Sequence, residues 1–183
     1  VAVLDAPVAG GGHLQSLVLS LGLPLAHPPN AAPGRDVAAR KLAMMVGGPV
    51  EAYERARPVF ESFAAAIAHM GESGAGAIAK LVNNLLFYAN AALAAEAVGL
   101  GRALGLDAAA LTRVMCDGSA SSTALQSYGP DFALWDFPND RHGLMQKDIL
   151  HALSVIKAEG RDPGNLGAAA LRALALAIPP DAS

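Results

Sequence analysis

The chain has 183 residues, of which 53% are hydrophobic and only 5% aromatic, and its formal net charge is −3. This length suffices for one domain, or one domain with part of another, and implies a core built mainly from Ala, Leu and Val. The lack of any basic run argues against nucleic acid as a partner. The single cysteine, Cys116, excludes an internal disulfide and is typical of a reducing cytoplasm.

Residues 1–48 combine two strand patterns with an irregular stretch between them. Val1–Val8 indicates the end of a buried strand and a turn, and Lys41–Gly48 indicates a second short strand with a tight exit. Residues 13–40 are rich in proline and glycine, which favour a loop. Because so long a loop is unusual in a compact domain, we interpret it as an atypical insertion, or as a sequence error over a shorter stretch.

Residues 50–71 predict a helix and then a strand. Val50–Ala66 is amphipathic, with an apolar side made of Tyr53, Ala56, Val59, Phe60 and Phe63. Ala66–Gly71 returns the chain to the sheet as a short strand. We interpret His69, within this strand, as a packing residue rather than a catalytic one.

The stretch Gly71–Leu104 is a glycine-rich turn followed by one long helix without proline from Ala75 onward. Ser73 can cap its start, and Gly105 can end it. Lys80 and Asn84 are four residues apart and therefore share one face of the helix. Polar groups in an apolar helix are costly unless satisfied, either by a substrate carboxylate or hydroxyl or, in the ordinary alternative, by water and neighbouring loops.

No membrane segment is predicted. Six polar or charged residues interrupt the long helix, whereas a spanning helix needs about 20 nearly uncharged residues; they are Lys80, Asn83, Asn84, Asn90, Glu96 and Arg102. The apolar run Leu17–Leu25 is too short to span and has no charged segment before it, as a signal peptide would.

Further helices are predicted after Gly105. Asp107 caps Ala108–Met115, and the later helices are Arg141–Glu159 and Ala168–Ile178. The Gly/Ser cluster from Asp117 to Ser122 starts another helix, where free N–H groups can bind a carboxylate or phosphate. A plain capped turn accounts for its composition equally well.

Five short motifs occur in an order that resembles the β-hydroxyacid dehydrogenases, namely DAPVAGG, MVGG, GAGAIAKLVNN, GSASS and KD. This family includes 3-hydroxyisobutyrate dehydrogenase and tartronate semialdehyde reductase and, more distantly, 6-phosphogluconate dehydrogenase. Each motif alone is weak, but five in the family's order are specific. They lie within about Leu4–Gly12 and Lys41–Gly160.

The resemblance implies a mainly α fold, in which an all-helical C-terminal dehydrogenase domain led by the long helix follows a small α/β remnant of a Rossmann domain. We expect the first domain at 1–72, with the insertion at about 13–40, and the helical substrate and dimerisation domain at 73–183. No GxGxxG fingerprint for a pyrophosphate occurs in the sequence, so we expect most of the Rossmann domain to be missing.

The resemblance also implies an NAD- or NADP-dependent oxidoreductase that transfers a hydride between the nicotinamide and a small β-hydroxyacid or its semialdehyde. Lys80 matches the family's acid/base, which accepts the hydroxyl proton and returns it in the reverse direction. Asn84 matches the residue that holds the substrate. Gly10 and Gly11 match backbone donors to the substrate, and Ser119 matches a carboxylate contact.

The KD pair is Lys147 and Asp148. In the family, this Lys lies near the nicotinamide end of the cofactor and the Asp maintains the architecture. The ordinary alternative is an ion pair on a helix surface.

Ala9 replaces the family's usual Ser, so that one hydroxyl contact to the substrate is lost. No metal site is expected.

A cytoplasmic homo-oligomer is expected, without nucleic acid or membrane partners. The alternative function is that of a non-catalytic helical dimerisation fragment that does not bind the cofactor. The missing fingerprint favours this alternative. So does an Ala-rich face that allows close contact between helices, within or between chains; it consists of Ala91, Ala94, Ala95 and Ala97–Gly101.

Overall fold

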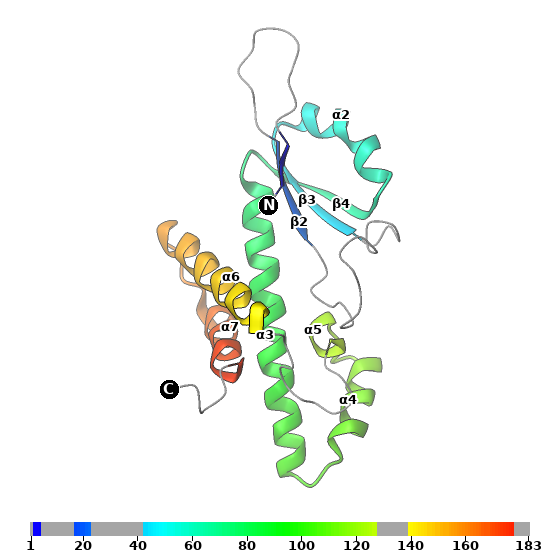
Figure 1. Cartoon of the computed structure of the whole chain (residues 1–183), viewed down its shortest axis with the longest axis vertical. Helices are drawn as coiled ribbons and strands as arrows, with labels where there is room; N and C mark the ends of the chain where they lie inside the picture. The colour runs from blue at the N-terminus through cyan, green and yellow to red at the C-terminus, as the bar shows by residue number, and fades with distance from the viewer. Residues whose placement is uncertain (1, 5–16, 23–41, 128–138, 178–183) are drawn as a thin grey trace. The chain divides into compact units, whose positions relative to one another are not determined.

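The computed structural model describes residues 2–4, 17–22, 42–127 and 139–177 (Figure 1). The chain divides into two compact units, Val1–Asn83 and Asn84–Ser183. This division falls inside a long helix, α3 (Ala75–Ala103), whereas the sequence puts the domain boundary before that helix. The boundary at 72/73 therefore stays a prediction. The mainly α character expected from the sequence is confirmed, since within the described ranges α3 and four further helices follow a small sheet with one helix.

The first unit contains a four-stranded sheet in the order β1-β2-β3-β4. β1 (Ala2–Leu4) pairs antiparallel with β2 (Leu17–Gly22), and β2 pairs antiparallel with β3 (Leu42–Gly47). β4 (Ala64–Gly71) runs parallel to β3, and α2 (Val50–Glu61) makes the crossover between them. Parallel neighbours require such a crossover, and a helix is its usual form.

Two sequence-based expectations need correction here. β2 lies within the stretch interpreted as an atypical loop, yet it pairs with strands on both of its sides. Its sequence, LVLSLG, is a nearly continuous apolar run, which is typical of a strand inside a sheet. The helix expected at Val50–Ala66 ends at Glu61, because the Ala-rich residues from Ala64 onward pair with β3 instead. Propensity is a weak guide where tertiary pairing decides.

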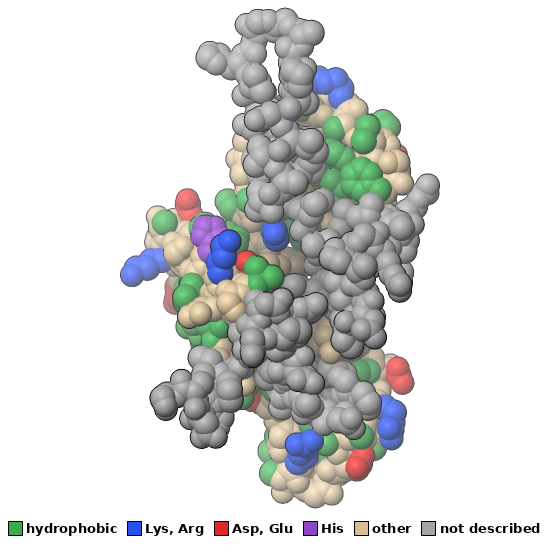
Figure 2. Space-filling model, viewed as in Figure 1, with side chains coloured by type: hydrophobic (Ala, Val, Ile, Leu, Met, Phe, Trp, Pro, Cys, Tyr) green, Lys and Arg blue, Asp and Glu red, His purple; other side chains and the backbone are tan. Residues whose placement is uncertain are grey.

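The core of the first unit lies between α2 and the sheet. Met44 and Val46, on alternate positions of β3, pack with Tyr53 and Phe60 of α2. Val59, which was expected on the same apolar side, is instead 61% exposed. Figure 2 shows apolar side chains over α2 at the upper right of the view, so this helix is less strictly amphipathic than predicted.

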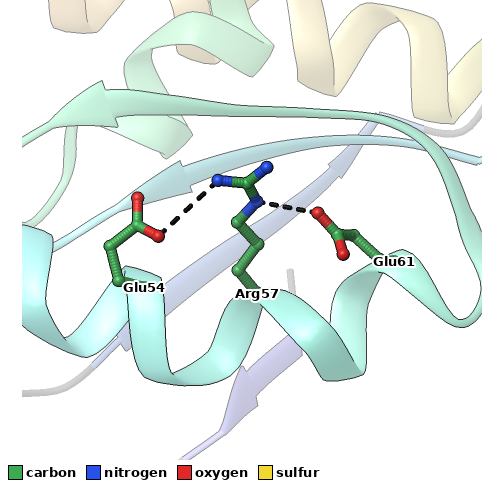
Figure 3. Close-up of polar contacts among 3 residues, drawn as sticks. All are labelled: Glu54, Arg57 and Glu61. Carbon is green, nitrogen blue, oxygen red and sulfur yellow. Dashed lines mark hydrogen bonds and ion pairs between the residues drawn. The ribbon is translucent and has the colours of Figure 1, made fainter.

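The opposite side of α2 carries a short row of charges (Figure 3). Arg57 Nε donates to Glu61 at 2.7 Å, and Arg57 Nη1 lies 3.6 Å from a Glu54 carboxylate oxygen. All three side chains are about half exposed. Because solvent screens such pairs, they mark the polar face of α2 and add little to stability.

The backbones of β3 and α3 approach each other closely where β3 ends and α3 begins. An ideal Cβ on Gly76 would lie 2.5 Å from the carbonyl oxygen of Met45, and one on Gly47 would lie 2.8 Å from the nitrogen of Gly76. Neither site can hold a larger residue without a backbone shift. Nearby, Nε2 of His69 donates a hydrogen bond of 2.7 Å to the Gly48 carbonyl oxygen, and the His69 ring stacks on Tyr53, as expected of a packing residue.

The long helix follows the prediction closely. It was expected to end near Leu104 and ends at Ala103. Gly105 has φ +82°, the N–H of Leu106 donates to Gly101 at 2.9 Å, and the N–H of Gly105 donates to Arg102 at 2.9 Å. This pair of hydrogen bonds is the Schellman motif, in which glycine after the helix satisfies the last carbonyl groups.

The remaining helices lie in the second unit. They are α4 (Ala108–Asp117), α5 (Thr123–Gln126), α6 (Asn139–Ala158) and α7 (Gly164–Ala177). Asp107 caps α4 as predicted, since its Oδ1 accepts from the N–H of Ala110 at 2.7 Å. α7 begins four residues before the predicted Ala168. The aromatic residues Trp135 and Phe137 lie outside the described residues.

Small side chains dominate the buried positions of the second unit. Ala92, Ala152, Ala170 and Ala173 have no exposed surface, and Leu85 and Val98 are almost fully buried. On α3, the Ala-rich face expected to allow close helix contact is largely buried within this chain, at Ala91, Ala94 and Ala95. The core of Ala, Leu and Val expected from composition is therefore confirmed in this unit.

Among the described residues, α3 is the one helix whose length and apolar composition would let it cross a membrane. Half of its most apolar window is buried in the structure. Core helices of soluble proteins meet the same criterion, so this is weak evidence for a membrane span.

Candidate functional site

Lys80 lies on α3 and is partly buried. Its neighbours in the sequence, Ala79 and Leu81, are apolar. Within the described part of the chain, no carboxylate forms an ion pair with it, whereas Arg57 and Arg172 both have such partners. A partly buried ammonium or amine without a carboxylate partner is a group that a polar ligand can satisfy.

Asn84 lies on the same continuous helix, one turn after Lys80 in the sequence. Its side chain is almost fully buried, with 6% exposed. The amide Nδ2 donates a hydrogen bond of 3.1 Å to Oδ2 of Asp148, which lies on α6 and is partly buried. Two motifs 64 residues apart, GAGAIAKLVNN and KD, are thus joined by a direct side-chain contact.

Tyr88 is the residue at this site that sequence reasoning missed. It follows Asn84 by one helical turn, is 3% exposed, and packs edge to face against the ring of Phe87 at 5.5 Å. Burial, and secondarily the negative charge of Asp148, raises the pKa of the Tyr88 hydroxyl above its usual range. The spacing of four residues from Asn84 was the available signal.

Asp148, rather than its neighbour Lys147, reaches the buried Asn84. Lys147 is exposed on α6, and Ser119 is exposed in the turn between α4 and α5. In the described ranges, neither of these two side chains forms a hydrogen bond or an ion pair. Ser122, in the same turn as Ser119, caps α5 by accepting from the N–H of Leu125 at 3.1 Å.

Two predicted site residues cannot be placed, because Gly10 and Gly11 lie outside the described residues. Among the residues that are described, no group of three or more His, Cys, Asp or Glu side chains comes together as a metal site would require. Of the candidate residues that are described, Asn84, Tyr88 and Asp148 form a cluster in the second unit, and Lys80 lies in the first unit.

Two protein-family models match this chain. Residues 74–177 match the model described as NAD-binding of NADP-dependent 3-hydroxyisobutyrate dehydrogenase. Residues 34–71 match the model described as the NAD binding domain of 6-phosphogluconate dehydrogenase. The first match covers more than half of the chain and includes Lys80, Asn84, Tyr88 and Asp148.

Curated relatives and solved structures agree with these models. A 3-hydroxyisobutyrate dehydrogenase of Pseudomonas aeruginosa is 42% identical over 109 residues, which covers 60% of this chain and 37% of that protein. An NAD-dependent L-serine dehydrogenase of the same species is 38% identical over 130 residues, which covers 71% of this chain and 36% of that protein.

Among solved structures, a 3-hydroxyisobutyrate dehydrogenase of Mycobacterium tuberculosis with L-serine matches at a TM-score of 0.58 and 30% identity. This match covers 80% of the present chain and 53% of that chain. The chain thus spans between about a third and a half of the length of these relatives.

Proposed function

Because the chain belongs to the β-hydroxyacid dehydrogenase family, a family of NAD(P)-dependent oxidoreductases, we propose that it takes part in hydride transfer between a nicotinamide cofactor and a small β-hydroxyacid or its semialdehyde. The observation that carries the proposal is Lys80, a partly buried amine on an apolar helix with no carboxylate partner in the described ranges. The substrates that name the relatives, 3-hydroxyisobutyrate and L-serine, both carry a carboxylate and a β-hydroxyl.

Lys80 acts as the acid/base in this proposal. When bound, the nicotinamide supplies the hydride acceptor or donor at the carbinol carbon. During oxidation, Lys80 Nζ accepts the proton of the substrate hydroxyl, and during reduction it returns that proton to the carbonyl oxygen. An amine that is not committed to an ion pair is available for this transfer.

Asn84 holds the substrate, and Asp148 holds Asn84. The hydrogen bond from Nδ2 to Asp148 restricts rotation of the buried amide, so its other polar atoms keep one orientation. A fixed orientation keeps the reacting carbon in line with the base and the cofactor, which is a large part of enzymatic rate enhancement. Gly10, Gly11 and Ser119 complete the proposed contacts to the substrate carboxylate.

The cofactor residue that we propose is Lys147. Its exposed ammonium, unpaired in the described ranges, is the kind of donor that suits the polar groups of NAD or NADP. Lys147 directly precedes Asp148 on α6, and Asp148 is the residue that contacts Asn84. No Gly-rich fingerprint for the pyrophosphate occurs in these 183 residues. The contact proposed for Lys147 is therefore limited to the nicotinamide end of the cofactor.

The experiment follows reduced-nicotinamide absorbance with the full chain, NAD or NADP, and either 3-hydroxyisobutyrate or L-serine. Lys80→Ala is expected to lower kcat by about 10²–10⁴-fold, the usual contribution of a positioned acid/base. Lys157→Ala, which removes an exposed lysine from the last turn of α6, is the matched control and should keep the wild-type rate.

Equal rates for Lys80→Ala and Lys157→Ala would contradict the acid/base role. A wild-type chain without turnover or cofactor affinity would contradict the enzymatic proposal and favour the non-catalytic alternative.

We also propose that the protein is a cytoplasmic homo-oligomer. Exposed leucines on α3 support association with a second copy. The single cysteine, Cys116, supports a reducing compartment.

A further inference from the structure

Tyr88 carries a hydroxyl group that the folded protein buries without a hydrogen bond. The residue is 3% exposed, and in the described ranges its hydroxyl neither donates to nor accepts from another residue. A buried hydroxyl without a partner costs free energy, because it has lost its hydrogen bonds to water. Phenylalanine would fill nearly the same volume without this cost. The hydroxyl of Tyr88 therefore calls for a polar group close by that it serves.

The carboxylate of Asp148 is the polar group that acts on this hydroxyl. Burial first, and then the negative charge of Asp148, raise the pKa of Tyr88 above its usual range. Asp148 is partly buried on α6, and no Lys or Arg of the described ranges forms an ion pair with it. A partly buried carboxylate without a cation is stabilised by hydrogen bonds from neutral donors.

Asn84 and Tyr88 offer two such donors on consecutive turns of α3. They are four residues apart, so they lie on one face of the helix, and both are almost fully buried. Asn84 already donates to Oδ2 of Asp148 at 3.1 Å, and a carboxylate can accept hydrogen bonds at both of its oxygens. Because the last torsion of an Asp side chain is broad, a small rotation of the carboxylate allows it to accept from both donors.

We propose that Tyr88 is a positioning residue of the candidate site, whose hydroxyl is the second donor to the Asp148 carboxylate and holds it in place for Asn84. Tyr88 touches neither substrate nor cofactor and acts only through Asp148 and Asn84. A carboxylate held by two donors is less free to turn away, so the buried amide of Asn84 keeps one orientation. The inference rests on the proposed function in so far as Asn84 holds the substrate.

The first test is kinetic and uses the full chain. Tyr88→Phe should raise KM for the hydroxyacid about 3–10-fold, the effect of one lost hydrogen bond, and leave kcat within about twofold of the wild type. A contact that holds substrate and transition state equally changes KM and not kcat. Tyr53→Phe is the matched control, because it removes a hydroxyl from a buried tyrosine of the first unit and should leave KM unchanged.

A double-mutant cycle tests whether Tyr88 acts through Asp148. Asp148→Asn keeps the shape of the side chain and removes its charge. In this background, Tyr88→Phe should have no further effect on KM, because the two changes interrupt the same chain of contacts. An equal rise of KM in both backgrounds, or no rise in either, would overturn the positioning role.

A measurement without turnover separates this inference from the proposed function. Hydrogen exchange of the Asn84 side-chain amide, followed by NMR, reports how firmly that amide is held. Tyr88→Phe should speed this exchange at least about threefold, and Tyr53→Phe should not. Faster exchange in Tyr88→Phe, in a chain that turns over no hydroxyacid, would uphold the contact and contradict the proposed function alone. Unchanged exchange in Tyr88→Phe would overturn the positioning role in an active and an inactive chain alike.

Discussion

The side-chain amide of Asn84 on α3 donates a hydrogen bond of 3.1 Å to the carboxylate of Asp148 on α6. Asn84 is almost fully buried, so this bond supplies a polar partner that water cannot. It also joins the residue proposed to hold the substrate to the second member of the KD pair. The contact therefore serves both the stability of the second unit and the orientation of the proposed site.

Asp148→Ala should destabilise the protein by about 1–3 kcal/mol, because it removes the acceptor of a hydrogen bond that a buried amide donates. Urea unfolding monitored by circular dichroism measures this change. Lys147→Ala is the matched neighbour, and it should change stability by less than about 0.5 kcal/mol, since Lys147 is exposed and unpaired in the described ranges. If Asn84→Ala and Asp148→Ala proved additive in a double-mutant cycle, the hydrogen bond would not contribute.

Two glycines of α3 should respond in opposite directions to alanine. Gly76→Ala should destabilise by about 1–3 kcal/mol, because its Cβ would lie 2.5 Å from the carbonyl oxygen of Met45. Gly99→Ala meets nothing within 4 Å, so it should stabilise by roughly 0.5–1 kcal/mol through helix propensity alone. Thermal unfolding midpoints compare the two, and a midpoint that rises in both variants would refute the close approach of β3 and α3.

Tyr88 should ionise later than an ordinary tyrosine, because burial, followed by the charge of Asp148, raises its pKa. The pKa of Tyr88 is higher in the folded than in the unfolded state. The contribution of Tyr88 to stability is therefore fully present below about pH 10 and is lost as the pH rises further. Ultraviolet titration of the three tyrosines should contain a late phase that Tyr88→Phe removes, together with part of the alkaline loss of stability. An unchanged titration in Tyr88→Phe would mean that Tyr88 is not the shifted group.

Opposite ends of α4 offer a test of capping. Asp107→Ala should cost about 0.5–2 kcal/mol, because Asp107 Oδ1 accepts from the N–H of Ala110 at the helix start. Asp117→Ala removes the same side chain from the last residue of α4, where a negative charge opposes the helix dipole. This second change should be neutral or slightly stabilising in urea unfolding. Equal losses in both variants would argue against the capping role.

The long helix was predictable because local signals agree along its whole length. Ala and Leu favour helix throughout, proline is absent, and Gly105 supplies the positive φ at the end. The boundary between α2 and β4 was not predictable in this way. The run Ala64–Ala68 has no local preference strong enough to oppose pairing with β3, and that pairing decides its structure. β2 was not predicted, because its apolar run was considered only as a possible membrane segment and not as a strand inside a sheet.

The motifs indicated the candidate residues one position at a time, and the roles of these residues stay proposals. Lys80 and Asn84 were identified by their place in GAGAIAKLVNN, and Asp148 by its place in the KD pair. That Asp148 contacts Asn84, and that Tyr88 lies buried beside them, depends on the packing of α3 with α6. No spacing along the sequence reports a contact between residues 64 positions apart.

Ala92, Ala152, Ala170 and Ala173 have no exposed surface, so the interior of the second unit is filled at these positions by single methyl groups. Few residues can replace alanine at such a position. A larger side chain must displace a neighbouring helix, and glycine destabilises the helix that contains it. A library randomised at these four codons and selected for folded protein should therefore return mostly alanine, with occasional serine, cysteine or glycine. The same selection for folding should accept more replacements at exposed positions of α4, such as Val114, than at these buried alanines.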